Sequence, residues 1–544
     1  MKKFNILVLF LAIFQNIYAF SLKIGDIYYN LDNENLTAEV TYESLWSDNN
    51  YDNLKSGVVI IPDSLYYFNT YYKVTSIGYG AFSYCKKMGA ILLPPTIQTI
   101  GEYAFLRCSN LTTINIPSSV NEIGFGGFEK CESLETVDIT DFTAWCKIKF
   151  HDSSSNPLTY AHRLMKNNKE ITIIDFPAEL NEVKKYAFTG GYFNKFTYNS
   201  DILSIGDYAF ENCLTLTDIE LPPSLKRIGE RAFEECRSLK EITIPDAVED
   251  IGGFAFQRCM NLEKVRLPEN LTEIKEHTFS DCSSLFDIMI PSKVTKIKRG
   301  AFYGCKSLTE INLPDALTEI GGWAFNECYY LKDLRIGNSL SKIDQNAFSY
   351  CDRLENLYIN DLEKWFRISF ENEYSNPLFY AKYIYLNGEL ITDLKIPESV
   401  YRIKPYTFYG SPSIITLSLH RDMGSIADYA FAKCTSLETI YCEFKPGTGN
   451  INIFPSSIYD TATLVVPEGN GWGLLYRERS PWKYFSNIID YPYAGINNAI
   501  SESEKLYTVY SSSGMLILKD AEKENLSNLS PGLYIINGKK TLIK

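Results

Sequence analysis

A phenylalanine returns every 23 residues along the middle of this 544-residue chain, without drift. The uninterrupted series is Phe210, Phe233, Phe256, Phe279, Phe302, Phe325 and Phe348. Phe82, Phe105 and Phe128 begin the same series, and Phe408 and Phe431 resume it. A fixed period of this length is typical of solenoids, in which each repeat is a coil that stacks on its neighbours. We therefore expect the function to lie on the surfaces of a stack.

Each repeat combines a strand pattern, a proline and a short turn. In the copy from Ile228 to Ile251, Ile242 and Ile244 alternate with polar residues, as in a short β-strand with one buried face. Pro245 follows, where a residue without a backbone N–H ends β pairing. A second short extended segment and a helical or 3₁₀ turn that carries Phe233 complete the predicted coil. Stacked coils would pair strand to strand at about 4.8 Å and share one continuous core.

The pattern L-x-x-I-x-[IL]-P-x-x-[VL]-x-x-I-G-x-x-A-F-x-x-C resembles the BspA-like leucine-rich repeats of bacterial surface proteins, over roughly residues 72–441. This resemblance implies a leucine-rich-repeat solenoid whose short parallel strands form the concave face. It also implies a secreted or surface-held protein that binds other macromolecules. It supplies no catalytic residue and no cofactor, so we expect a binding protein rather than an enzyme.

The first nineteen residues predict export. Lys2 and Lys3 precede an apolar run from Phe4 to Phe14, and Ala19 fits a cleavage site, as in a secretory signal peptide. The run is short for a membrane span, and no other segment approaches about 20 uninterrupted apolar residues. We therefore expect no transmembrane segment, and a location that is secreted or on the outer cell surface.

Eleven of the thirteen cysteines follow a repeat phenylalanine by three residues and so fall in one interior column. Stacked coils would hold adjacent Cβ atoms about 4.8 Å apart, farther than the ~3.8 Å that a disulfide prefers. The column therefore predicts buried free thiols that pack as small apolar residues. A metal array is the alternative, but no histidine accompanies the column and its spacing differs from that of zinc sites. Cys146 and Cys442 lie off the column, and their pairing stays open.

A second, longer period indicates a tandem duplication of the chain. Phe82 and Cys85 of the first coils recur as Phe302 and Cys305, and the coils that follow keep the same offset. Both copies contain an irregular insertion of about fourteen residues, near 140–165 and 360–385. Its aromatic residues are candidate contacts with a partner: Trp145, Tyr160, Trp365 and Tyr380. The favoured alternative is that the tryptophans dock back onto the stack, because large apolar side chains are more often buried than presented.

The comparison of the two duplicated halves argues against an enzyme. His151 and His162 flank the first insertion, but Glu371 and Lys382 replace them in the second. No nucleophile elbow, glycine-rich phosphate loop or H-E-x-x-H motif is present in the sequence. The formal net charge of −13 and the lack of a basic run argue against a nucleic-acid partner.

The chain divides into a solenoid with flanking segments. The predicted segments are a signal peptide at 1–19, an N-terminal β cap at 20–71, the solenoid at 72–444, a C-terminal cap at 445–491, a linker at 492–505 and a small β domain at 506–544. The caps would cover the exposed ends of the stack. In the last segment, Asn537-Gly538 signals a tight hairpin. This segment resembles the C-terminal sorting domain of the type IX secretion system of Bacteroidetes, which implies passage across the outer membrane.

The strand positions between the inward residues define a candidate binding surface. Its residues are Lys240, Glu241, Glu263, Lys264, Arg266, Phe286, Asp287, Met289, Glu310, Lys332, Asp333 and Arg335. Phe286 and Met289 interrupt charged columns, and an apolar anchor rimmed by charges is how many contact hot spots are built. A chance apolar pair on a wide sheet is the competing interpretation.

We predict a cell-surface protein that adheres to a protein or glycan macromolecule through this sheet or through the paired insertions. Two alternatives stay open at this stage. One is a secreted hydrolase or glycan-processing factor that uses the solenoid as a scaffold, and the other is a structural component of a surface layer.

Overall fold

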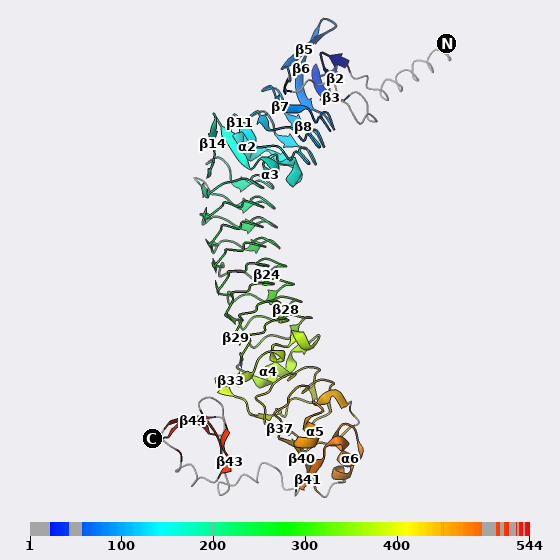
Figure 1. The fold of residues 1–544 in the computed structure, drawn as a ribbon, viewed down its shortest axis with the longest axis vertical. Helices are drawn as coiled ribbons and strands as arrows, with labels where there is room; N and C mark the ends of the chain where they lie inside the picture. Colours follow the sequence, from blue (N-terminus) through cyan, green and yellow to red (C-terminus); the bar gives the residue numbers. More distant parts are fainter. Residues whose placement is uncertain are drawn as a thin grey trace, which may run out of the picture. The chain divides into compact units, whose positions relative to one another are not determined.

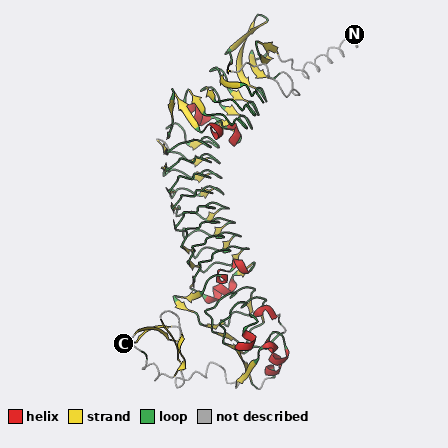
Figure 2. Cartoon of the chain, viewed as in Figure 1, coloured by secondary structure: helices red, strands yellow, loops and turns green. Residues whose placement is uncertain are grey.

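The computed structural model describes residues 22–42, 57–198, 201–447, 449, 451–468, 471–491, 507–511, 516–521, 529, 532–536 and 539–543. The predicted signal peptide, the predicted linker and the Asn537-Gly538 turn lie outside these residues. Short strands and turns dominate the described chain, and helices are few (Figures 1 and 2). The chain forms two compact units, Met1–Asn270 and Leu271–Lys544.

The first unit starts with a β-rich end piece. An eight-stranded sheet contains β1 (Leu22–Ile24), β2 (Ile27–Asp32), β3 (Thr37–Thr41), β5 (Ser64–Tyr67), β6 (Thr70–Ile77), β8 (Thr99–Ile100), β10 (Glu122–Ile123) and β12 (Lys149–Phe150). Strands β1 to β3 form an antiparallel meander, and β5 and β6 form an antiparallel hairpin. From β3 through β6, β8, β10 and β12 the pairing is parallel, so the end piece leads directly into the coils.

The second long sheet of this unit presents the other strand of each coil. It contains β4 (Gly57–Ile60), β7 (Met88–Leu92), β9 (Thr113–Ile116), β11 (Thr136–Ile139), β13 (Arg163–Lys166) and β14 (Lys169–Glu170). The first insertion adds α2 (Phe142–Lys147), η1 (Ser153–Ser155) and α3 (Leu158–Ala161). The remaining strands of the unit are β15 (Ile173–Phe176), β16 (Glu182–Val183), β17 (Lys195–Tyr198), β18 (Ser204–Ile205), β19 (Asp218–Ile219), β20 (Arg227–Ile228), β21 (Glu241–Thr243), β22 (Asp250–Ile251) and β23 (Lys264–Arg266).

The second unit repeats this plan. One strand of each coil pairs in parallel through β24 (Glu273–Ile274), β26 (Lys296–Ile297), β28 (Glu319–Ile320), β30 (Lys342–Ile343) and β32 (Ser369–Phe370). The other face contains β25 (Asp287–Ile288), β27 (Glu310–Asn312), β29 (Asp333–Arg335), β31 (Asn356–Ile359), β33 (Tyr383–Leu386) and β34 (Glu389–Leu390). The second insertion adds α4 (Leu362–Arg367), η2 (Glu373–Ser375) and η3 (Pro377–Phe379).

Further coils and a closing segment complete the second unit. They contain β35 (Asp393–Lys395), β36 (Arg402–Ile403), β37 (Thr416–Leu419), β38 (Ser425–Ile426), β39 (Thr439–Cys442), η4 (Ile451–Ile453), α5 (Ile458–Thr461), β40 (Thr463–Pro467), α6 (Trp472–Glu478), η5 (Trp482–Tyr484) and β41 (Asn487–Tyr491). The C-terminal segment forms a four-stranded antiparallel sheet of β42 (Tyr507–Ser511), β43 (Leu516–Ala521), β44 (Gly532–Ile536) and β45 (Lys539–Ile543). The predicted repeat solenoid of short parallel strands is thus confirmed.

The repeat phenylalanines are buried and stack on one another. Phe210 and Phe233 lie 5.2 Å apart at an interplanar angle of 6°, and Phe302 and Phe325 lie 5.3 Å apart at 5°. Strand pairing fixes this spacing, because each coil repeats the same backbone path one strand further on. The rings therefore form a stacked core column on either side of the insertion in each unit.

The cysteine column lies beside the rings and is confirmed as a ladder of buried free thiols. Cys146 and Cys442, whose pairing the sequence left open, are also free and buried. The thiols do more than fill space: Cys236 Sγ donates a hydrogen bond to the Phe210 carbonyl of the preceding coil at 3.2 Å, and most of the column repeats this contact. Burial raises the pKa of the Cys236 thiol well above its ordinary value.

The predicted helical or 3₁₀ turn around each phenylalanine is a short turn with 3₁₀-type hydrogen bonds and not a regular helix. In the coil of Phe233, Arg231 and Glu235 both adopt left-handed backbone conformations, with φ of 54° and 59°. Isolated hydrogen bonds of the i to i−3 type, such as Cys236 N–H to the Phe233 carbonyl, close the turn between them. Two left-handed residues per coil interrupt regular helical geometry, so a series of tight turns replaces a helix.

Candidate functional site

The two insertion tryptophans are not available to a partner. Trp145 and Trp365 are each only 1 % exposed, and their indole N–H groups donate to the carbonyls of Ala187 at 3.1 Å and Thr407 at 3.0 Å. The interpretation of these two residues as contact residues is therefore wrong, and the alternative that they dock back onto the coils is confirmed. The physical reason is that burial of a large ring, with its one polar group satisfied, stabilises the fold more than exposure would.

The insertion tyrosines also make structural contacts, although they are only half-buried. Tyr160 and Tyr380 each accept a hydrogen bond at the phenol oxygen from a backbone N–H, that of Lys130 at 3.0 Å and that of Tyr350 at 2.9 Å. Burial is the main cause that raises the pKa of both phenols. These contacts tie each insertion to the turn of the preceding coil, and they leave only part of each ring to solvent.

A buried asparagine in the recurring Asn-Pro dipeptide holds each insertion in place. Asn156 Nδ2 donates to the Tyr186 carbonyl at 2.7 Å, and its Oδ1 accepts from the Leu158 N–H at 2.9 Å. Asn376 makes the same pair of contacts in the second copy. The recurrence of Asn-Pro in both copies was the available signal, since Asn commonly bonds the backbone two residues on.

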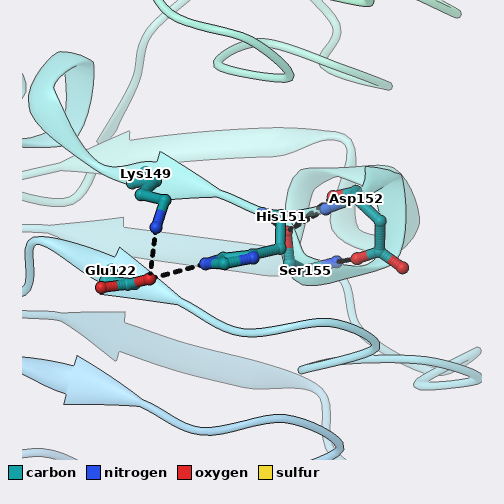
Figure 3. Close-up of polar contacts among 5 residues, drawn as sticks. All are labelled: Glu122, Lys149, His151, Asp152 and Ser155. Carbon is teal, nitrogen blue, oxygen red and sulfur yellow. Dashed lines mark hydrogen bonds and ion pairs between the residues drawn. The ribbon is translucent and has the colours of Figure 1, made fainter.

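A polar cluster lies on the first insertion, where a histidine could suggest catalysis. His151 Nε2 lies 2.6 Å from Glu122 Oε1, and Lys149 Nζ lies 2.8 Å from the same oxygen (Figure 3). Lys149 first and His151 second lower the pKa of the Glu122 carboxyl. The Ser155 hydroxyl is turned to the backbone instead, because it donates to the Asp152 carbonyl at 2.6 Å. The His151 ring thus contacts Glu122 and packs edge-on against Phe125, and it is the backbone N–H of His151 that donates to the Ser155 hydroxyl. This geometry supports no Ser–His reaction.

The predicted strand surface faces solvent in the first unit. In β21 and β23, Glu241 is paired in register with Lys264, and the apolar residue between the outward positions of each strand is buried. Lys240 is exposed and Glu263 is half-buried. Arg266 is bound at its guanidinium by Asp246 at 3.0 Å. This part of the surface is therefore a largely exposed face of mixed charge.

The predicted apolar pair also faces solvent, in the second unit. Phe286 is 45 % exposed and Met289 is 78 % exposed, and Asp287 next to Phe286 is exposed as well. The register assigned from the sequence is therefore correct at these positions. Glu310 is exposed on the neighbouring coil of the same unit.

The predicted residue Arg335 belongs to a row of stacked side chains that extends over the next two strands. The guanidinium of Arg335 lies 4.0 Å from the ring centroid of Tyr358, and Tyr358 stacks on Tyr385 at 5.0 Å and 19°. The three side chains come from adjacent strands, because Arg335, Tyr358 and Tyr385 occupy one row of the β29–β31–β33 register. We call these three residues the Arg–Tyr stack.

Charged and amide groups surround the Arg–Tyr stack. Asn356 Nδ2 donates to Asp333 Oδ1 at 2.8 Å, in the row next to the stack. Glu355 lies between two lysines, 3.5 Å from Lys332 and 3.9 Å from Lys382. Burial first and then the Asp333 charge raise the pKa of the Tyr358 phenol, whose hydroxyl donates to Asp333 Oδ1 at 3.4 Å.

The first half of the chain offers an internal comparison. At the positions that correspond in the duplication, Asn115, Asp138 and Met165 replace the Arg–Tyr stack on the equivalent β9–β11–β13 rows. There the side chains bond along the sheet: Asn115 binds both backbone groups of Leu93, and Asp138 accepts from Thr113 at 3.2 Å. The same backbone thus folds without the Arg–Tyr stack, so the fold does not require these aromatic and guanidinium groups.

The repeat architecture, with its face of short parallel strands, defines a leucine-rich-repeat protein. A family model described as the BspA type leucine rich repeat region, in six copies, matches residues 62–160, 159–286, 274–376 and 380–464. Because these segments cover well over half of the sequence, the chain belongs to the BspA-type leucine-rich-repeat family.

Several solved structures are similar to the chain. One is a leucine-rich repeat protein from Bacteroides ovatus, with 24 % identity, coverage of 87 % of this chain and 99 % of that one, and a TM-score of 0.49. Another is a leucine rich cell surface protein from Faecalibacterium prausnitzii, with 21 % identity, coverage of 78 % and 95 %, and a TM-score of 0.39. No curated protein matches the chain.

None of the helices in the described residues is long and apolar enough to span a bilayer. In the same part of the chain, no group of three or more His, Cys, Asp or Glu side chains could hold a metal ion.

Proposed function

We propose that this is an exported cell-surface protein that binds another protein through the outward strand face of β29, β31 and β33. The observation that carries the proposal is the Arg–Tyr stack. Arg335, Tyr358 and Tyr385 form an ordered row that the first half of the chain lacks on the same backbone. Since the fold does not require these side chains, we infer that they serve to contact a partner.

The chemistry of this face suits a protein partner. Tyrosine and arginine are enriched at the centres of protein interfaces, since they supply large contact area and hydrogen bonds at a small cost in side-chain entropy. Stacking holds the Tyr358 ring before any partner arrives, which reduces the ordering cost of binding. Lys332, Glu355 and Lys382 around the stack would form the polar rim that selects the partner by charge.

The test is a binding assay with two matched variants. The mature chain is screened against purified extracellular proteins and glycans, and the affinity for any saturable protein ligand is then measured for Tyr358→Ser and for Asp138→Ser. We expect Tyr358→Ser to weaken binding at least about tenfold and Asp138→Ser to leave it unchanged. Equal affinity of both variants, or saturable binding of glycans alone, would refute the proposal.

Adhesion at the cell surface is the role that we propose for this binding, with export directed by residues 1–19. We further propose that the four-stranded C-terminal sheet, β42 to β45, is a sorting module of the type IX kind. Its sequence resemblance supports this assignment. Deletion of residues 506–544 would then retain the chain inside the outer membrane, and normal surface display of the truncated chain would contradict it.

A further inference from the structure

The hairpin of β5 and β6 carries the two most exposed aromatic side chains of the described chain. Phe68 is 81 % exposed at its tip and Tyr71 is 69 % exposed, with Tyr66 at 57 % beside them. In Figure 1 the hairpin extends beyond the neighbouring strands of the N-terminal end piece. A protein surrounded by water rarely gathers large rings this exposed without a use for them.

The backbone of the tip holds these rings outward. Phe68 and Asn69 both adopt left-handed conformations, with φ of 46° and 64°. Such a conformation is unusual for a bulky residue, and the preferred residues at this kind of hairpin turn are Asn and Gly. Tyr66 donates from its hydroxyl to Asn69 Oδ1 at 2.7 Å, and its ring lies 4.7 Å from that of Tyr71. The hairpin thus accepts a disfavoured turn residue and displays a phenyl ring at the apex.

The tip also lacks charge. Residues 64–72 contain no Asp, Glu, Lys or Arg, and the first charged residues on either side are Asp63 and Lys73. The two strands pair across the hairpin at Tyr66–Tyr71 and Tyr67–Thr70, and among the described strands β5 pairs with β6 alone. The outer edges of the hairpin therefore keep backbone groups that need water or lipid headgroups as partners, so the uncharged tip can enter the headgroup region while its backbone stays out of the hydrocarbon core.

We propose that this hairpin inserts its tip into the interfacial region of a lipid bilayer. Phe68 would enter the boundary of the acyl chains, and Tyr66 and Tyr71 would remain at headgroup level. Tyrosine favours that depth because its ring is apolar and its hydroxyl is polar. The buried apolar area is small, so the interaction is reversible and weak.

The charge of the chain favours zwitterionic over anionic lipid as the binding partner. The chain carries a formal net charge of −13, and its tip has no basic residue. Attraction to anionic headgroups needs clustered lysine or arginine. The hairpin should therefore bind zwitterionic phosphatidylcholine vesicles, and raised salt should leave binding unchanged because no charge pairing is involved.

The experiment is co-sedimentation of the mature full-length chain with phosphatidylcholine vesicles over a range of lipid concentrations. We compare the wild type with the Phe68→Ser, Tyr71→Ser double variant, and with Phe286→Ser, which removes an exposed ring far along the sequence. We expect the double variant to lose at least about tenfold in partitioning and Phe286→Ser to match the wild type. Phe68→Trp should in addition gain quenching by brominated phosphatidylcholine over the wild-type signal.

Three results would overturn the proposal. The first is no sedimentation of the wild type at saturating lipid, which would favour a protein pocket as the receptor of the tip. The second is undiminished binding of the double variant. The third is binding that requires anionic lipid or disappears at high salt. Because all three side chains are exposed, unchanged thermal unfolding of the variants is expected and establishes that they are folded.

Discussion

Glu211 offers a sharp test of the packing between coils. It follows Phe210 by one residue and is half-buried, and Glu234 occupies the equivalent position on the next coil. Arg231 forms an ion pair with Glu234 at 2.7 Å. The Arg231 charge also lowers the pKa of the Glu211 carboxyl, but by less than burial and the Glu234 charge raise it. Burial first, and then the negative charge of Glu234, raise the pKa of the Glu211 carboxyl from its ordinary 4.5 to about 7.

The sign and size of the effect on stability follow from this shift. The folded chain holds the Glu211 proton more tightly than the unfolded chain does, so protonation stabilises the fold. The contribution is complete below about pH 4.5 and is lost as the pH rises through about 7. At 1.36 kcal/mol per pKa unit, the full shift corresponds to about 3 kcal/mol. Residual solvent around the carboxyl lowers the expected value to about 1–3 kcal/mol.

Glu211→Gln keeps the shape of the side chain and cannot ionise. We expect it to stabilise the protein by about 1–3 kcal/mol at pH 8 relative to wild type, with the difference vanishing near pH 4.5. Denaturation at pH 4.5, 6 and 8, with hydrogen exchange to localise the change, measures it. Glu241→Gln, on the exposed strand face, should change stability by less than about 0.5 kcal/mol throughout. A Glu211→Gln effect that is the same at every pH would refute the reasoning.

Three further predictions concern the core and the strand face. A bulky thiol reagent should find almost no reactive cysteine in the native protein and about thirteen after denaturation without reductant; recovery of one or two would contradict the free-thiol ladder. Phe279→Ala should cost about 3–5 kcal/mol, seen as faster hydrogen exchange in adjacent coils, and unchanged exchange there would place the ring outside the core. Phe286→Ser with Met289→Ser should leave the melting temperature nearly unchanged, because both side chains are exposed; a large drop would show that they pack inward.

The sequence was sufficient for most of the fold because a strict period leaves little freedom. A coil of fixed length must place Phe233 and Cys236 at the same depth as their equivalents one repeat away, so their burial follows from the spacing alone. The left-handed turn residues did not follow. Arg231 and Glu235 are ordinary helix formers, and only the path that each coil must take around its phenylalanine forces them into that conformation.

Of the three residues in the Arg–Tyr stack, the sequence predicted only Arg335 as part of a binding surface. Arg335 was identified by its place between inward strand residues, and one more repeat step reaches Tyr358. Tyr385 is harder to find, because the insertion makes the step from β31 to β33 longer than the repeat period. Part of the extra length also forms the antiparallel β33–β34 hairpin at the sheet edge. The repeat spacing alone could not show how the extra residues are distributed between the helical segments and this hairpin.

The central claim is that the Arg–Tyr stack binds a protein partner while the same backbone in the first half does not need such a stack. The most direct measurement converts the second copy into the first, with Arg335→Asn, Tyr358→Asp and Tyr385→Met in one variant, and compares its dissociation constant for the captured protein ligand with that of wild type. We predict at least a roughly hundredfold loss of affinity, about 2.7 kcal/mol, at an unchanged melting temperature. Wild-type affinity in the folded triple variant would contradict the claim.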